Sequence, residues 1–181
     1  YIDGLGLNEY LKQQGVLSLA ETRAMLHEIA SALDYAHERG LVHRDIKPSN
    51  VMLRANGPVP HAVLMDFGIA KLRDSQTRYT GSGAIGTIDY MAPEQILAAR
   101  EVDHRADVYA LGVMTFEMLT GRHPFEGGPA QVMFAHLQQP APDARSLKPD
   151  LPDAPAQALL RALAKDPAER FASAGAFVQS L

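Results

Sequence analysis

The 181-residue sequence contains no cysteine. Disulfide bonds and thiolate metal sites are therefore excluded within it, and a reducing compartment suits it. It also lacks any apolar run approaching the ~20 residues of a membrane-spanning helix. The net charge of −4 does not indicate a strongly basic surface for nucleic acid or anionic lipid. Length and composition, with 46% hydrophobic residues, are typical of one globular domain with a sizeable core.

Helical periodicity covers most of the sequence. Ser18 and Glu21 form a capping-box pattern, which predicts a long helix ending near Arg39. The uninterrupted apolar residues 108–114 predict that a helix over residues 103–120 is buried on all sides. Shorter helices are predicted over residues 8–14, 129–139 and 155–165, and from about residue 173.

Two short strands are predicted over residues 51–54 and 62–65, with a turn at residues 56–58. They would form a two-stranded hairpin. Asn50 would then lie at the start of one strand and Asp66 at the end of the other, so that the two side chains are brought close together.

The stretch from His43 to Asn50 carries the densest functional signal. Asp45 has a cation on either side, Arg44 and Lys47, and Asn50 follows five positions later. A carboxylate that accepts a hydroxyl proton, a lysine that neutralises charge and a second oxygen ligand suit phosphoryl transfer. Taken alone, a mixed-charge octapeptide containing proline also fits a solvated turn.

Two further motifs favour the phosphoryl-transfer interpretation over a solvated turn. Asp66-Phe67-Gly68 and then Ala92-Pro93-Glu94 follow the octapeptide at plausible spacing. With these motifs in this order, the whole chain resembles the protein kinase family, in particular its C-terminal lobe. The resemblance implies a mainly α fold, a helical bundle around a buried central helix, with a small β-hairpin at the catalytic cleft.

The resemblance also implies how residues 1–181 are organised. Residues 1–7 resemble the hinge between the two kinase lobes. The N-terminal lobe, with its Gly-rich loop, lysine and glutamate, would then precede this stretch in a longer chain and act as its partner. We expect this stretch alone to transfer phosphate poorly or not at all.

The roles implied at the cleft concern ATP and Mg²⁺ or Mn²⁺. Asp45 would be the general base and Lys47 would neutralise charge, with Thr87 bonded to both. Asn50 and Asp66 would hold the metal. Nucleotide contacts would come from Asp66 and from two residues at the adenine, Ile2 and Met52.

Other residues are implied to support these groups. The ring of His43 would prop the catalytic loop against Phe67. Asp107 would hold the backbone of that loop, and Glu94 would form a buried ion pair with Arg170. Gly81 to Gly86 also match a G-x-G-x-x-G phosphate loop by letter, but no strand precedes them, so we reject that reading.

A lysine two residues after the catalytic aspartate, here Lys47, resembles the serine/threonine rather than the tyrosine kinases of the family. The sequence as a whole resembles the bacterial members. We therefore expect a serine/threonine protein kinase acting on protein substrates. The alternative is a pseudokinase or docking module. That alternative predicts loss of the catalytic set, and Asp45, Lys47, Asn50 and Asp66 are all present.

Regulation is expected in the polar segment from residue 72 to 85. Arg44 directly precedes the catalytic Asp45, as in family members switched by phosphorylation. Phosphorylation at Thr80, with Thr77 and Ser82 as alternates, would supply the anion that Arg44 needs. A kinase dimer for trans-autophosphorylation would be a further partner. We expect a cytoplasmic location and leave open a membrane anchor outside this stretch.

Overall fold

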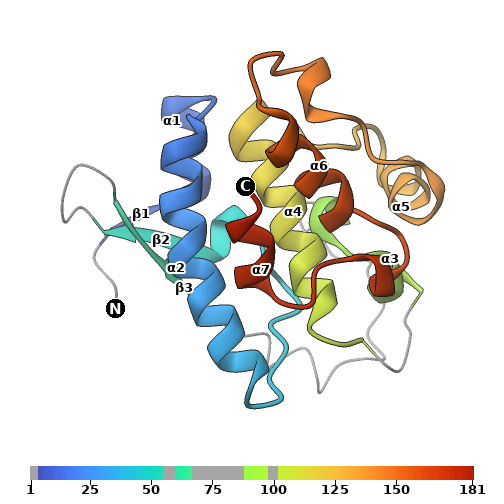
Figure 1. The fold of residues 1–181 in the computed structure, drawn as a ribbon, viewed down its shortest axis with the longest axis horizontal. Coiled ribbons are helices and arrows are strands. Elements are labelled where there is room, and N and C mark those ends of the chain that lie inside the picture. The colour runs from blue at the N-terminus through green and yellow to red at the C-terminus, as the bar shows by residue number, and fades with distance from the viewer. Residues whose placement is uncertain (1–3, 55–59, 67–87, 98–101) are drawn as a thin grey trace.

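The computed structural model describes residues 4–54, 60–66, 88–97 and 102–181. These residues form a mainly helical body with one small sheet at its edge, as the sequence predicts (Figure 1). No helix within the described ranges is long and apolar enough to cross a membrane.

Helix α4, Arg105–Thr120, runs through the centre of the body (Figure 1). Nearly all of its side chains are buried, and helices α2 (Leu19–His37), α6 (Asp153–Ala162) and α7 (Ala174–Gln179) pack around it. The helix ends at Gly121, whose φ of 72° lies in the left-handed region that suits glycine. The prediction of a buried central helix is confirmed, although the helix starts at Arg105 rather than residue 103.

Helix α2 begins with the predicted capping box. The Ser18 hydroxyl accepts a hydrogen bond from the Glu21 amide, and the Glu21 carboxylate accepts one from the Ser18 amide. Its apolar face packs on α4, α7 and strand β3 (His61–Leu64). On the same helix, the Asp34 carboxylate accepts hydrogen bonds from the Ala174 and Gly175 amides, each at 2.9 Å. Asp34 therefore joins the end of the chain to α2.

The sheet has three antiparallel strands in the order β1–β2–β3. The predicted hairpin is confirmed as the β2–β3 pair, and strand β1, which the sequence did not predict, adds a third strand beside β2. Strand β2 is Val51–Arg54, and the additional strand β1 is Leu5–Gly6. A β-carbon on the preceding Gly4 would lie 2.4 Å from the Leu53 carbonyl oxygen. Glycine allows this close approach, while the same glycines make the stretch resemble a turn in the sequence.

The remaining elements are short. Helix α5 lies at the opposite end of the body from the sheet (Figure 1). Helix α6 starts two residues before the predicted start, because Pro155 is tolerated in a first helical turn, and ends three residues before the predicted end. The other elements are α1 (Leu7–Gln14), η1 (Pro48–Asn50), η2 (Ile88–Tyr90), α3 (Pro93–Ile96), α5 (Pro129–Gln138), η3 (Ala144–Ser146) and η4 (Pro167–Glu169).

Candidate active site

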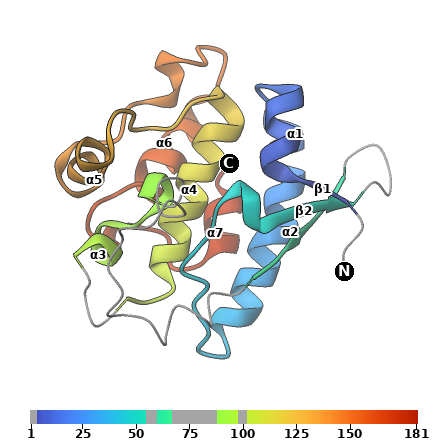
Figure 2. The same ribbon diagram turned by 180° about the vertical axis from the view of Figure 1, so that it is seen from behind.

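The segment from His43 to Asn50, called the catalytic turn below, connects α2 to strand β2 and lies between the sheet and α4 (Figure 2). Its backbone has an unusual conformation at Arg44, where φ is 64°. A non-glycine residue in this region costs about 1–3 kcal/mol and persists only where its surroundings impose the conformation. The contacts of the turn show what imposes it.

Asp107 of α4 is the main support of the catalytic turn. Its carboxylate accepts hydrogen bonds from the backbone amides of His43 and Arg44, both at 2.8 Å. It also accepts one from His37 Nε2 at 2.8 Å, and the carboxylate is buried with 1% of its surface exposed. Three donors therefore compensate the buried charge, and the strained backbone at Arg44 is held from the centre of the helical body.

His43 connects the catalytic turn to the end of strand β3. Its ring is fully buried. Nε2 donates to the Met65 carbonyl at 2.9 Å, while Nδ1 accepts from the Asp45 amide at 3.3 Å. A ring that donates at one nitrogen and accepts at the other is a neutral imidazole in a single tautomer. His43 therefore supports the backbone on which Asp45 sits.

Asp45 lies between the two polar side chains that the sequence places beside it. Lys47 Nζ is 3.2 Å from Asp45 Oδ2, and Asn50 Nδ2 donates to the same oxygen at 3.2 Å. Asn50 Nδ2 also donates to the Asp45 backbone carbonyl at 2.7 Å. The described structure therefore brings Asp45, Lys47 and Asn50 together in one cluster.

Asn50 and Asp66 lie at neighbouring ends of strands β2 and β3. The Asn50 carbonyl accepts a hydrogen bond from the Met65 amide at 2.8 Å, and Asp66 follows with a left-handed φ of 55°. Because the Asn50 amide nitrogen faces Asp45, its amide oxygen is the atom it can offer to a cation. A carboxylate and an amide oxygen are donors that Mg²⁺ accepts, so this pair fits the metal that the sequence predicts.

Arg170 and Glu94 form the buried ion pair that the sequence predicts. The two guanidinium nitrogens donate to the two carboxylate oxygens at 2.7 and 2.9 Å, and the Arg170 side chain is fully buried. Arg170 also donates to the carbonyls of Ala164, Arg105 and Lys165. The guanidinium therefore fastens α3 to α4 and to the end of α6.

Two supporting residues were not predicted from the sequence. The Gln95 side chain donates to the Arg44 carbonyl at 3.0 Å and accepts from the Ala92 amide at 3.1 Å, which joins α3 to the catalytic turn. The second such residue is His37, whose ring donates to the buried Asp107 carboxylate. Neither residue stands in a pattern that distinguishes it from an ordinary helix residue.

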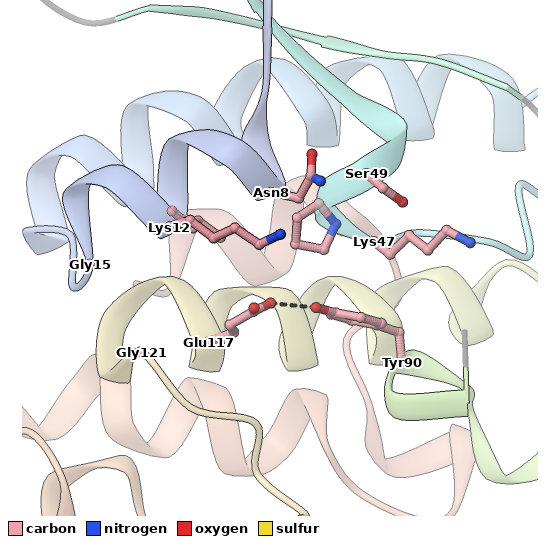
Figure 3. Close-up of a pocket in the computed structure, with 10 residues that line it drawn as sticks. Asn8, Lys12, Gly15, Lys47, Ser49, Tyr90, Glu117 and Gly121 are labelled. Atoms are coloured by element: carbon pink, nitrogen blue, oxygen red, sulfur yellow. Dashed lines mark hydrogen bonds between the residues drawn. The ribbon is translucent and has the colours of Figure 1, made fainter. Parts of the chain in front are cut away.

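A pocket of about 400 Å³ opens next to the catalytic turn (Figure 3). Lys12 of α1 lies on one side, and the Tyr90–Glu117 pair lies on the other (Figure 3). Burial, and then the Glu117 carboxylate, raises the pKa of the Tyr90 hydroxyl far above its usual value. Tyr90 therefore stays a donor to Glu117. The lining residues are Asn8, Leu11, Lys12, Gly15, Lys47, Pro48, Ser49, Tyr90, Glu117 and Gly121.

The other predicted site residues have different outcomes. Met52 lies on the middle strand, paired with Gly6 and Val63. The Arg44 guanidinium donates to the Val102 carbonyl at 3.3 Å. The following predicted residues lie outside the described ranges: Ile2, Phe67, Thr77, Thr80, Ser82 and Thr87, with the turn at 56–58 and the glycine-containing stretch 81–86.

Comparison with known proteins agrees with this arrangement. The serine/threonine-protein kinase Pkn1 of Myxococcus xanthus is 45% identical over 184 residues, which cover 100% of this chain and 26% of that protein. The serine/threonine-protein kinase PrkC of Bacillus subtilis is 37% identical and covers 96% of this chain and 26% of its own length. This chain thus spans about a quarter of the length of these curated relatives.

Among solved structures, the kinase domain of Mycobacterium tuberculosis PknI superposes with a TM-score of 0.75 at 34% identity, covering 99% of this chain and 62% of that chain. A sequence profile described as the protein kinase domain matches residues 1–180. The profile match and the relatives together show that the chain belongs to the protein kinase family.

Proposed function

We propose that the protein is a serine/threonine protein kinase, which moves the γ-phosphoryl group of ATP to hydroxyl groups of protein substrates. The observation that carries the proposal is the position of Asp45. Its carboxylate contacts Lys47 and Asn50 and stands on a backbone that Asp107 holds. The serine/threonine preference is supported by Lys47 and by the relatives, which are named serine/threonine-protein kinases.

In this proposal Asp45 orients the substrate hydroxyl and accepts its proton as the hydroxyl oxygen bonds to the γ-phosphorus. The bond from that phosphorus to the leaving oxygen breaks, and ADP departs with the electron pair. Lys47 stabilises negative charge on the transferring group. Asn50 and Asp66 would hold Mg²⁺, which when bound supplies charge neutralisation on the phosphate oxygens.

The pocket beside the catalytic turn supports a binding place for the substrate chain. It is open next to Lys47 and Ser49, and it has both a cation, Lys12, and a carboxylate, Glu117, on its walls. A segment of a protein substrate in extended conformation could thus approach Asp45 between α1 and α4. The wall at Tyr90 belongs to η2, the segment that leads into Ala92-Pro93-Glu94.

The test replaces the proposed base. In the full-length protein, Asp45→Asn should lower phosphoryl transfer about 10²-fold or more, because a positioned general base contributes that much. Transfer from radiolabelled ATP to a synthetic peptide of residues 72–86 would be measured, with ATP binding and melting temperature as checks on the fold. Asp150→Asn is the matched control, since the Asp150 side chain is exposed and lies 3.5 Å from Lys148 on the surface. Equal transfer by the Asp45→Asn variant and the unmodified protein would reject the role assigned to Asp45. Absence of transfer by both proteins would favour a non-catalytic docking module.

A further inference from the structure

His136 is a buried polar residue on α5, a helix that contributes no residue to the catalytic turn. Its Nε2 donates a hydrogen bond to the Asp89 backbone carbonyl at 3.0 Å. Asp89 is the middle residue of η2, between Ile88 and Tyr90. This hydrogen bond therefore joins helix α5 to the short segment that carries a wall of the pocket.

The other ring nitrogen has its own partner. The hydroxyl oxygen of Tyr109, on the central helix α4, lies 2.8 Å from His136 Nδ1. Burial raises the pKa of the Tyr109 hydroxyl, so this group keeps its proton and donates it to Nδ1. The proton of the neutral imidazole must then sit on Nε2, where it faces Asp89. Tyr109 thus selects the tautomer that reaches η2.

The surroundings keep the ring neutral. Edge-on aromatic contacts place Phe125 at 5.0 Å and Tyr109 at 5.7 Å between ring centroids. Burial first, and then the Lys165 ammonium, lowers the pKa of His136 to about 4. Lys165 donates to the Ala135 carbonyl at 2.9 Å and lies 4.4 Å from the Phe125 centroid. The groups around His136 therefore exclude the imidazolium, which could not accept from Tyr109.

A simple packing role does not account for this arrangement. An apolar ring would fill the same space without any need for two hydrogen-bond partners. The His136 bond instead ends on a backbone carbonyl directly before Tyr90. The Tyr90 hydroxyl in turn donates to Glu117 at 2.5 Å and lies 3.0 Å from His123 Nε2. Displacement of the Asp89 carbonyl would therefore move a wall of the pocket.

We propose that His136 is a positioning residue for substrate binding. Through Asp89 it sets the place of Tyr90, and through Tyr90 it sets the shape of the pocket that receives the protein substrate. The inference rests on the proposed kinase function and assigns to α5 a part in substrate affinity rather than in phosphoryl transfer.

The test compares two replacements of His136 in the full-length protein. His136→Phe keeps an aromatic ring and removes both hydrogen bonds. His136→Gln retains a side-chain donor and an acceptor. With the peptide of residues 72–86 as substrate, His136→Phe should raise KM for the peptide about 5–20-fold, the effect of losing one or two buried hydrogen bonds. In His136→Phe, KM for ATP and the rate of ATP hydrolysis without peptide should stay within about twofold of the unmodified protein. His136→Gln should restore most of the peptide affinity that His136→Phe loses.

Tyr109→Phe is the second variant and His27→Gln the control. Tyr109→Phe removes only the hydrogen-bond donor to His136 Nδ1, so it should raise KM for the peptide by a smaller factor than His136→Phe. If His136→Phe does not fold, Tyr109→Phe is the variant that tests the positioning role. His27 is exposed on α2, and its replacement should change neither constant. An unchanged KM for the peptide in folded His136→Phe, or an equal loss in peptide transfer and ATP hydrolysis, would overturn the inference.

Hydrogen–deuterium exchange separates this inference from the kinase assignment, because it needs no activity. The Met91 amide donates to the Ile88 carbonyl at 3.1 Å across η2. Its exchange should be faster in His136→Phe than in the unmodified protein, and close to normal in His136→Gln. Unaltered exchange in η2 contradicts the positioning role. Absence of any phosphoryl transfer by the unmodified protein contradicts only the proposed function.

Discussion

The two sides of the candidate active site are held by different kinds of interaction. The catalytic turn is held through its backbone, because Asp107 accepts hydrogen bonds from two successive amides. The opposite side, formed by η2 and α3, is held mainly through side chains, by the Glu94–Arg170 pair and by His136. Both sides are anchored to residues of the central helix or to its immediate neighbours.

The difference follows from what each side must keep in place. The catalytic turn carries a left-handed residue, Arg44, and hydrogen bonds to its backbone amide and carbonyl hold that conformation. The η2–α3 side consists of short helical turns in ordinary conformation. This side needs to be held at a defined position relative to the helical body. Long side chains that reach it from other elements, such as those of Arg170 and His136, can do so.

The largest effect is expected where the charge pair on the η2–α3 side is broken. Arg170→Met should lower the free energy of unfolding by about 3–5 kcal/mol, because Glu94 would remain as a buried charge without its partner. Chemical denaturation would measure the loss. The control is Arg122→Met, which breaks an exposed pair with Glu126 and should lower the stability much less than Arg170→Met. In the double variant Glu94→Gln/Arg170→Met no charge is left over, so the cost should be smaller than in Arg170→Met alone.

A smaller loss of stability, with a larger loss of activity, is expected on the backbone-held side. Asp107→Asn keeps the size of the side chain but turns one acceptor oxygen into a donor that faces an amide. Unfolding free energy should fall by about 2–3 kcal/mol, and phosphoryl transfer about 10²-fold, since the catalytic turn loses its geometry. Asp103→Asn, just before the same helix, is the control because, within the described residues, the Asp103 carboxylate accepts hydrogen bonds from the neighbouring Arg105 and from no other residue. Similar activity in both variants would show that the backbone bonds of Asp107 are dispensable.

The smallest effect concerns pH and His136. The pKa of this ring falls from an ordinary 6.5 to about 4 on folding. Above pH 6.5 the ring is neutral in both states, and between pH 6.5 and 4 only the unfolded chain takes up the proton. Stability should therefore decrease as pH falls through this window, and between pH 6.5 and 5 the share of His136 should be about 1–2 kcal/mol.

Urea unfolding at several pH values would measure this share as the difference between the unmodified protein and His136→Gln. Carboxylates that titrate in the same pH range are present in both proteins, so their contribution to the pH dependence of stability cancels in the difference. Identical slopes for the two proteins would mean that the folded protein accepts the proton at His136 without penalty.

Local signals in the sequence determined much of the helical fold. The Ser18–Glu21 capping box and the glycines at residues 15 and 121 mark helix ends, because caps act within one turn of the chain. The unbroken apolar run at 108–114 determined which helix is central, since such a helix is stable only when it is covered on all sides. The order of three motifs was sufficient to indicate the family and to place Asp45, Lys47 and Asn50 in one turn.

The contacts across the body were decided by tertiary structure. Strand β1 is recognisable only through its pairing with β2, since its residues have the composition of a turn. His37, Gln95 and His136 are ordinary helix residues until the fold brings them to partners 70, 51 and 47 positions away. A hydrogen bond between such distant residues leaves no periodicity in the sequence, because its geometry depends on how whole helices pack. The sequence therefore determined which groups could do the chemistry, and the packing decided which groups hold them in place.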